Sequence, residues 1–315
     1  MRRLSTRFSI AAMAGVAVLL SACGQVNNAA ESAADPEPSK ISIVTSTNVY
    51  GDIARTIGGE KVQVTTIINK LSQDPHSYEP TAQDRLDLSK ASLIIGNGAG
   101  YDPFLDRITK DLGVSEDRVL HAVDVAGRTG AGSTVAKPGD GPINEHFWYS
   151  MSAASRIAQE IASRLSAVDP AGAAGFSANA EKFKAEAATI SDRLEAIKMR
   201  SGGEGVALTE PLPVYMLDAA GLQNRTPEAF MEASEEGNDV PPSALQSTID
   251  VVSSADVRFL AYNDQTSTPQ SEKVRKAAEA AKLPVVIFTE TLPEGKTFIQ
   301  WMSENAGNID AALRS

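Results

Sequence analysis

The chain has 315 residues, 42% of them hydrophobic, and a formal net charge of −11 from 40 acidic and 29 basic side chains. This acidic balance argues against nucleic acid as a partner, because binding to phosphates needs clustered lysine and arginine. Cys23 is the only cysteine, so no intrachain disulfide is possible and the fold has to be held by its hydrophobic core.

Residues 1–22 have the pattern of a secretory signal peptide. Three arginines precede an apolar run of about 13 residues, which ends in small residues before Cys23. A helix that crosses a membrane needs about 20 apolar residues, so we expect this segment to export the chain and not to span the bilayer. The alternative, a buried N-terminal helix, is disfavoured because no polar face interrupts the run.

The segment LSAC at residues 20–23 resembles the lipobox of bacterial lipoproteins. The resemblance implies that Cys23 is lipidated and becomes the mature N-terminus, and the alternative is a cysteine without a role. Residues 23–40 have few large apolar side chains and end in proline-rich sequence, which predicts a flexible tether. We therefore expect a lipid-anchored protein on the extracytoplasmic face of the cell membrane.

From residue 41 onward, short β-branched runs alternate with longer amphipathic stretches. In the first half, strands are expected at residues 41–45, 62–68, 92–96 and 118–123, and a helix is expected at 152–167 after a glycine-rich stretch. Residues 171–199 contain almost no helix breaker and predict a helix about 44 Å long, which is expected to span two lobes. The alternative is a surface helix of one large domain.

The second half repeats the alternation, with strands expected at residues 205–209, 257–262 and 283–288 and helices near 243–254, 270–282 and 296–313. Strands that alternate with helices imply parallel sheets. The predicted fold is α/β, with two lobes that each hold a mainly parallel sheet flanked by helices, joined by one long rigid helix. The lobes are expected at 41–168 and 201–315, with the bridging helix at 169–200.

Ligands of open α/β sheets sit beyond the carboxyl ends of the strands, so polar residues that follow strands are the candidates for a site. His76, His146, Glu210 and Glu290 stand out, and each half presents an apolar strand followed by Thr-Glu. Two imidazoles and two carboxylates could close around a divalent ion. Taken singly, a loop histidine is usually solvated and a glutamate after a strand usually caps a helix, so spacing alone is a weak argument.

Several segments resemble the zinc- and manganese-binding solute-binding lipoproteins of ABC importers (cluster A-I). They include GG at 58–59, DPHSYEPT at 74–81, GNG at 96–98 before Tyr101, and DP at 169–170 with NA at 179–180. The resemblance covers nearly the whole mature body. It implies two α/β lobes joined by a rigid helix, with a metal ion in the cleft between them.

The same resemblance places the four metal ligands, in chain order, on His76, His146, Glu210 and Glu290. The sequence departs from the family pattern at two of them: His146 follows Asn-Glu in place of Asp-Pro, and Glu290 stands where Asp is usual. Asp218 is a substitute should Glu210 point away.

His121, inside an expected strand, is interpreted as a structural histidine. The second lobe also offers Glu235 as an acid near the cleft.

The resemblance implies capture of a divalent transition metal, manganese or zinc with iron as a further option, and its delivery to an ABC permease. We expect a monomer that is not an enzyme. A surface adhesin or interaction lipoprotein with a structural metal is the alternative. A secreted metal-dependent hydrolase is a third class, but the chain has no HExxH pattern.

Overall fold

The computed structural model describes residues 40–126 and 143–315. The predicted signal peptide, Cys23, almost all of the predicted tether and the whole glycine-rich stretch lie outside the described residues. The described residues belong to one compact unit that begins at residue 39. None of the helices in this part of the chain combines the length and apolar character that a membrane crossing requires.

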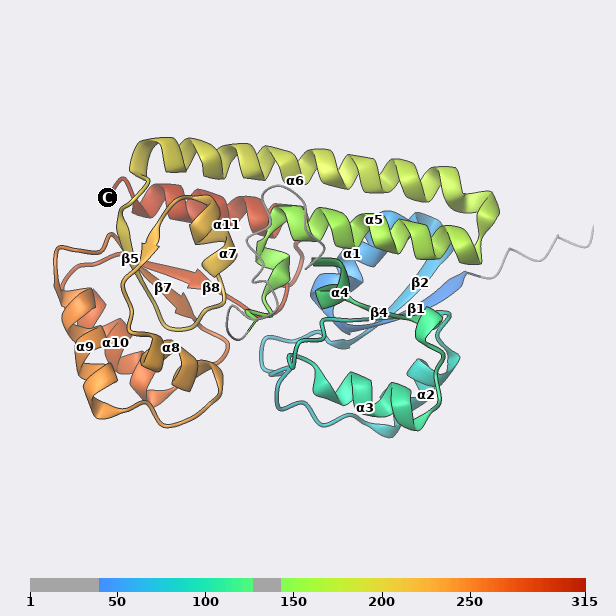
Figure 1. Cartoon of the computed structure of the whole chain (residues 1–315), viewed down its shortest axis with the longest axis horizontal. Helices are drawn as coiled ribbons and strands as arrows, with labels where there is room; N and C mark the ends of the chain where they lie inside the picture. The colour runs from blue at the N-terminus through green and yellow to red at the C-terminus, as the bar shows by residue number, and fades with distance from the viewer. Residues whose placement is uncertain (1–39, 127–142) are drawn as a thin grey trace, which may run out of the picture. The chain divides into compact units, whose positions relative to one another are not determined.

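Four parallel strands in the order β2-β1-β3-β4 form the first sheet (Figure 1). The strands are β1 (Ile41–Thr47), β2 (Val62–Ile68), β3 (Leu93–Gly96) and β4 (Val119–His121). The central strands β1 and β3 are buried almost throughout, whereas the edge strand β2 has several exposed or half-buried side chains. Continuous burial is expected where helices cover both faces of a parallel sheet, and the apolar runs of β1 and β3 meet this need.

The helices of the first half are α1 (Asn48–Gly58), α2 (Ala82–Lys90), α3 (Pro103–Asp111), α4 (Ala122–Ala126) and α5 (Met151–Val168). Short 3-10 helices lie at Gly59–Lys61, Glu116–Arg118, Phe147–Tyr149 and Pro170–Gly172. A capping box between Thr81 and Asp84 begins α2. The strand expected at 118–123 is shorter in the structure, because the chain leaves the sheet after β4 and enters α4 at once.

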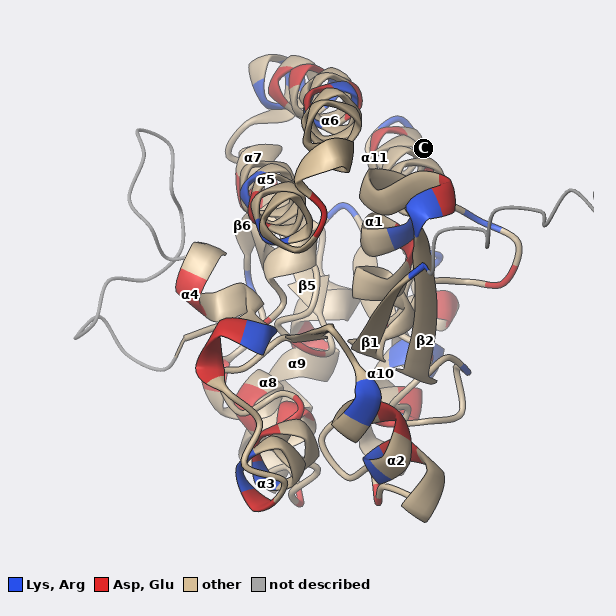
Figure 2. Ribbon diagram, turned by 90° about the vertical axis from the view of Figure 1, so that its right-hand side faces the viewer, with Lys and Arg blue, Asp and Glu red and all other residues tan. Residues whose placement is uncertain are grey.

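A 29-residue helix, α6 (Ala173–Ser201), joins the two sheets and confirms the predicted long helix. It packs against α1 and α5 of the first half and against α7 and α11 of the second, and Figure 1 shows it running along both. The buried residues are spaced alternately four and three positions apart, which places them on one face. They are Phe176, Ala180, Phe183, Ala187, Ile190, Leu194 and Ile197. Acidic and basic residues both occur elsewhere on α6, where they form ion pairs with each other (Figure 2).

The second sheet repeats the first, with four parallel strands in the order β6-β5-β7-β8. Its strands are β5 (Gly205–Leu208), β6 (Gln223–Asn224), β7 (Leu260–Asn263) and β8 (Val285–Phe288). The helices are α7 (Val214–Ala219), α8 (Glu228–Glu235), α9 (Pro242–Ser253), α10 (Pro269–Ala280) and α11 (Phe298–Ala312). The sequence pattern does not predict β6, α7 or α8, because each is too short to show a periodicity.

Hydrogen bonds tie the two halves together beside α1. Asn48 Nδ2 donates to the Leu292 carbonyl (2.7 Å), and the Leu292 N–H donates back to Asn48 Oδ1 (2.8 Å). The Phe298 N–H, at the start of α11, donates to Asp52 Oδ2 (2.7 Å). A hydrophobic cluster of buried residues also continues from the first half into the second.

We expect Phe183→Ala to lower the free energy of unfolding by about 3–5 kcal/mol. The Phe183 ring on α6 stacks on Phe298 of α11 with ring centroids 5.6 Å apart, and both side chains are buried. Urea unfolding followed by circular dichroism measures the change. Met199→Ala is the matched control, because Met199 lies on the same helix with 81% of its surface exposed; it should stay within about 0.5 kcal/mol of the wild type. Similar losses in both variants would contradict this account.

Candidate metal centre

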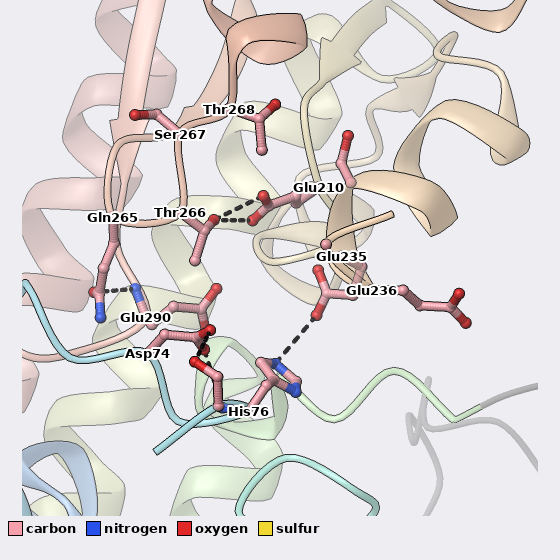
Figure 3. A pocket seen from close by; sticks show the side chains of 13 residues that line it. Asp74, His76, Glu210, Glu235, Glu236, Gln265, Thr266, Ser267, Thr268 and Glu290 are labelled. Atoms are coloured by element: carbon pink, nitrogen blue, oxygen red, sulfur yellow. Dashed lines mark hydrogen bonds and ion pairs between the residues drawn. The ribbon is translucent and has the colours of Figure 1, made fainter. Parts of the chain in front are cut away.

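The predicted ligands that follow strands lie around one cavity in the structure. His76 lies in the loop after β2, Glu210 follows β5 by two residues, and Glu290 follows β8 by two residues. These three side chains help to line a cavity of about 470 Å³ (Figure 3). His146 immediately precedes the 3-10 helix Phe147–Tyr149 and reaches the same place from the first half of the chain.

His146 is fully buried, and Asn144 orients its ring. Asn144 Oδ1 lies 2.7 Å from His146 Nδ1 and also accepts a hydrogen bond from the His146 backbone N–H (3.0 Å). Because an amide oxygen only accepts, Nδ1 carries a hydrogen and donates it. Nε2 then faces Glu235 Oε1 and Glu290 Oε2, each 3.3 Å away.

The Nε2 atom of His146 has no hydrogen-bond partner within residues 40–126 and 143–315. Its neighbours are the two carboxylates at 3.3 Å, so a divalent ion bound among them would take the position of the Nε2 proton. Metal-bound histidines characteristically donate their other ring N–H to a fixed oxygen, which is the role of Asn144 here. The arrangement around His146 therefore fits a ligand of a metal ion.

His76 is less buried, with 28% of its side chain exposed, and it stands at the mouth of the cavity. Its loop is shaped by Asp74, whose carboxylate accepts hydrogen bonds from the His76 N–H (3.0 Å) and from Ser77 Oγ (2.8 Å). The His76 ring packs edge-on against Tyr101, with centroids 5.0 Å apart. These contacts aim Nε2 toward the carboxylates on the opposite wall.

Asn263, the last residue of β7, holds the two strand-end glutamates side by side. Its Nδ2 donates to Glu290 Oε1 (2.8 Å) and also to Glu210 Oε2. Thr266 Oγ1 adds a hydrogen bond to Glu210 (2.7 Å), and Tyr101 Oη adds one to Glu290 (3.2 Å). Asn263 obeys the same strand-end rule as the two glutamates, because it also ends a strand at the same edge of the sheet.

Two further acids complete the centre. Glu235 Oε1 lies 3.8 Å from His76 Nε2, and Glu145 Oε1 lies at the same distance. One potential ligand atom from each of His76, Glu145 and Glu235 lies within 4.8 Å of the others. The sequence indicates Glu235 only as an acid near the cleft, and Glu145 is not among the expected ligands, although it directly precedes His146.

Asp218 and His121 lie elsewhere. Asp218 is on α7 and is not among the residues that line the cavity. His121 ends β4, where its Nε2 is 3.4 Å from Asp106 Oδ1, and it does not line the cavity either. Its role as a structural histidine stays a prediction.

The side chains of the centre offer more negative than positive charge, and their pKa values reflect this. Burial opposes a charge on His146, but the carboxylates of Glu235 and Glu290 outweigh it and raise the His146 pKa to about 10. Burial raises the pKa of Glu235 to about 8 and that of Glu210 to about 7. The pKa of Glu290 stays below its usual range, because His146 outweighs the burial of this carboxylate. A divalent cation would relieve the repulsion between these acids.

A family model described as zinc-uptake complex component A, periplasmic, matches residues 43–312. The chain belongs to this family. Membership in the component A family confirms the resemblance to metal-binding solute-binding lipoproteins of ABC importers.

Curated relatives of this chain include lipoproteins named for manganese. The manganese ABC transporter substrate-binding lipoprotein scaA of Streptococcus gordonii is 24% identical over 311 residues, which cover 93% of this chain and 94% of the relative. The manganese-binding lipoprotein MntA of Halalkalibacterium halodurans is 29% identical over 171 residues, which cover 53% of this chain and 52% of the relative.

Solved structures confirm the predicted fold class of this chain. The SBP FpvC from Pseudomonas aeruginosa in complex with Mn²⁺ superimposes with a TM-score of 0.68 at 21% identity, covering 88% of this chain and 99% of that chain. A crystal structure of ZnuA gives a TM-score of 0.66 at 20% identity, with coverages of 88% and 98%. Both share the arrangement of two α/β lobes and a long helix expected for this chain.

Proposed function

We propose that this chain captures a divalent transition metal ion, manganese or zinc, between its two halves and delivers it to the permease of an ABC importer. The main support for this proposal is the environment of His146 Nε2. This atom is buried without a hydrogen-bond partner among the described residues, and it faces two carboxylates at 3.3 Å. Family membership and the names of the similar lipoproteins support the same role.

His76, His146, Glu210 and Glu290 are the proposed ligands. Two ligand atoms about 2.1 Å from an ion, at a tetrahedral angle, lie roughly 3.4 Å apart. The distance of 3.3 Å between His146 Nε2 and Glu290 Oε2 agrees with this value. Glu210 is held beside Glu290 by Asn263 and would add a second carboxylate. Mixed nitrogen and oxygen ligands suit Mn²⁺, Zn²⁺ and ferrous iron.

The lipid predicted on Cys23 would keep the loaded protein beside a membrane permease. Similar lipoproteins are named as substrate-binding components of ABC transporters, which supports such an anchor and partner for this chain. In this role the protein binds and releases its ion as a monomer, without catalysis and without a nucleic-acid partner. The lipid anchor would then keep the protein at the membrane while it binds and releases successive metal ions.

Removal of the His76 imidazole should weaken the binding of both Mn²⁺ and Zn²⁺ by at least about tenfold, because one ligand is lost. The measurement is calorimetric titration of chelator-treated protein that begins at residue 23 and carries Cys23→Ser. His121→Ala is the matched control, since it removes an imidazole that does not line the cavity. Wild-type affinity in His76→Ala, or an equal loss in His121→Ala, would show that the proposed ligand set is wrong.

Metal exchange separates transport from the alternative of a surface lipoprotein with a structural metal. A transported ion has to leave the folded protein, so a chelator should remove it while the far-ultraviolet circular dichroism stays unchanged. Rebinding should then restore the original stoichiometry. Release that occurs only together with unfolding would favour the structural role.

A further inference from the structure

Glu235 differs from the other acids of the centre because a helix, not a strand end, supplies it. It is the last residue of α8 and lines the cavity (Figure 3). Its Oε1 lies 3.3 Å from His146 Nε2 and 3.8 Å from His76 Nε2. One carboxylate oxygen of Glu235 therefore faces both imidazoles of the proposed ligand set.

The position of Glu235 is unfavourable for a carboxylate unless a cation is nearby. Only 14% of its side chain is exposed, and neither carboxylate oxygen has a hydrogen-bond partner in the described parts of the chain. The residue also ends a helix, where the free carbonyl groups carry partial negative charge and disfavour an anion. A buried carboxylate without hydrogen bonds is costly and needs a charged partner or a metal.

The distances around Glu235 agree with those between ligands of one ion. Its separations from the two imidazoles, 3.3 and 3.8 Å, lie on either side of the roughly 3.4 Å expected for neighbouring ligand atoms in a tetrahedral site. Glu290 Oε2 lies at a similar distance from His146 Nε2 (3.3 Å). An ion bound by both histidines would therefore lie within reach of Glu235 as well as Glu290.

We propose that Glu235 is a direct ligand of the captured ion and favours Mn²⁺ over Zn²⁺ in this centre. The proposal rests on the proposed function. The second half then supplies three carboxylates, those of Glu210, Glu235 and Glu290, and the first half supplies two imidazoles. Carboxylate oxygens and coordination beyond four suit Mn²⁺, whereas Zn²⁺ is commonly satisfied by four ligands that include nitrogen or sulfur.

The test compares Glu235→Gln with Glu236→Gln in calorimetric titrations of Mn²⁺ and Zn²⁺. Glutamine keeps the size of the side chain and removes its charge. Glu236 is a matched control, because it lines the same cavity but its carboxylate accepts a hydrogen bond from Asn238 (2.7 Å). We expect Glu235→Gln to weaken Mn²⁺ binding at least about tenfold and Zn²⁺ binding less, while Glu236→Gln changes either by less than about threefold.

A second measurement reports on coordination directly. The visible absorption of bound Co²⁺ should differ between wild type and Glu235→Gln and should match the wild type in Glu236→Gln. Thermal unfolding checks that each variant folds, and Glu235→Asp, with its shorter reach, should give an intermediate Mn²⁺ affinity.

Unchanged affinity and Co²⁺ absorption in Glu235→Gln, with weakened binding in His76→Ala, would overturn the role of Glu235 and leave the proposed function intact. Equal losses for Mn²⁺ and Zn²⁺ would overturn the preference for Mn²⁺. Wild-type binding in both Glu235→Gln and His76→Ala would overturn the proposed function itself.

Discussion

His146→Ala is expected to weaken binding of Mn²⁺ and Zn²⁺ by at least about 100-fold, or about 2.7 kcal/mol. His146 is the most deeply buried histidine of the centre, and its Nε2 faces both Glu235 and Glu290. The variant loses a proposed ligand and leaves these carboxylates facing an empty space without a compensating imidazole. The expected loss is therefore larger than for His76, which stands at the exposed mouth of the cavity. Calorimetric titration measures it.

Asn144→Ala is expected to weaken metal binding less than His146→Ala does. The variant keeps the imidazole but removes the oxygen that accepts from Nδ1, so the ring loses its fixed orientation. Loss of such a supporting hydrogen bond typically weakens metal binding about 10–100-fold. The expected order of affinity is wild type, Asn144→Ala and then His146→Ala, with thermal unfolding as a check of the fold. Binding by His146→Ala at wild-type strength would contradict its assignment as a ligand.

Metal binding is expected to release protons, in a number that increases as the pH falls. The pKa of His146 is about 10, so its ring is charged at neutral pH in the protein without a cation and has to lose a proton to bind one. The pKa values of about 8 for Glu235 and about 7 for Glu210 add further protons at lower pH. The number released should rise from about one at pH 8.5 to about three at pH 6, and affinity should fall as the pH is lowered.

Calorimetry in buffers of different ionisation enthalpy measures these protons, because the apparent binding enthalpy changes in proportion to the number released. The His121→Ala variant should release as many as the wild type, since His121 lies outside the cavity. His146→Ala, where it still binds at high metal concentration, should release about one fewer. Binding without proton release at pH 6 would show that the carboxylates and imidazoles are not the ligands.

The fold was predictable where the sequence carries a clear period. The β-branched runs at β1, β2 and β8 have no competing pattern, and α6 shows a long stretch without breakers. The short elements were not predictable, because two residues of β6 or six of α7 give no periodicity to recognise.

The candidate site was predictable in part, for a topological reason. The carboxyl ends of parallel strands meet at one edge of a sheet, which selects Glu210 and Glu290 from their positions alone. Glu235 does not follow a strand. It reaches the cavity because α8 packs beside it, and the sequence pattern does not predict that packing. Asn263 follows the strand-end rule, but its amide could not be assigned a role before its two carboxylate partners were known.

The length of α6 also bears on how the cargo can leave. This helix runs along both halves, and the bonds that join Asn48 to Leu292 and Asp52 to Phe298 tie the halves beside it. A wide hinge motion would have to break the apolar contacts along α6 as well as these bonds, whereas a shift confined to α8 and the loop of His76 would leave the bonds of Asn48 and Asp52 in place. Unloading at the membrane would then require the rearrangement of a few short segments, and the free energy for it could come from contacts with the permease surface alone.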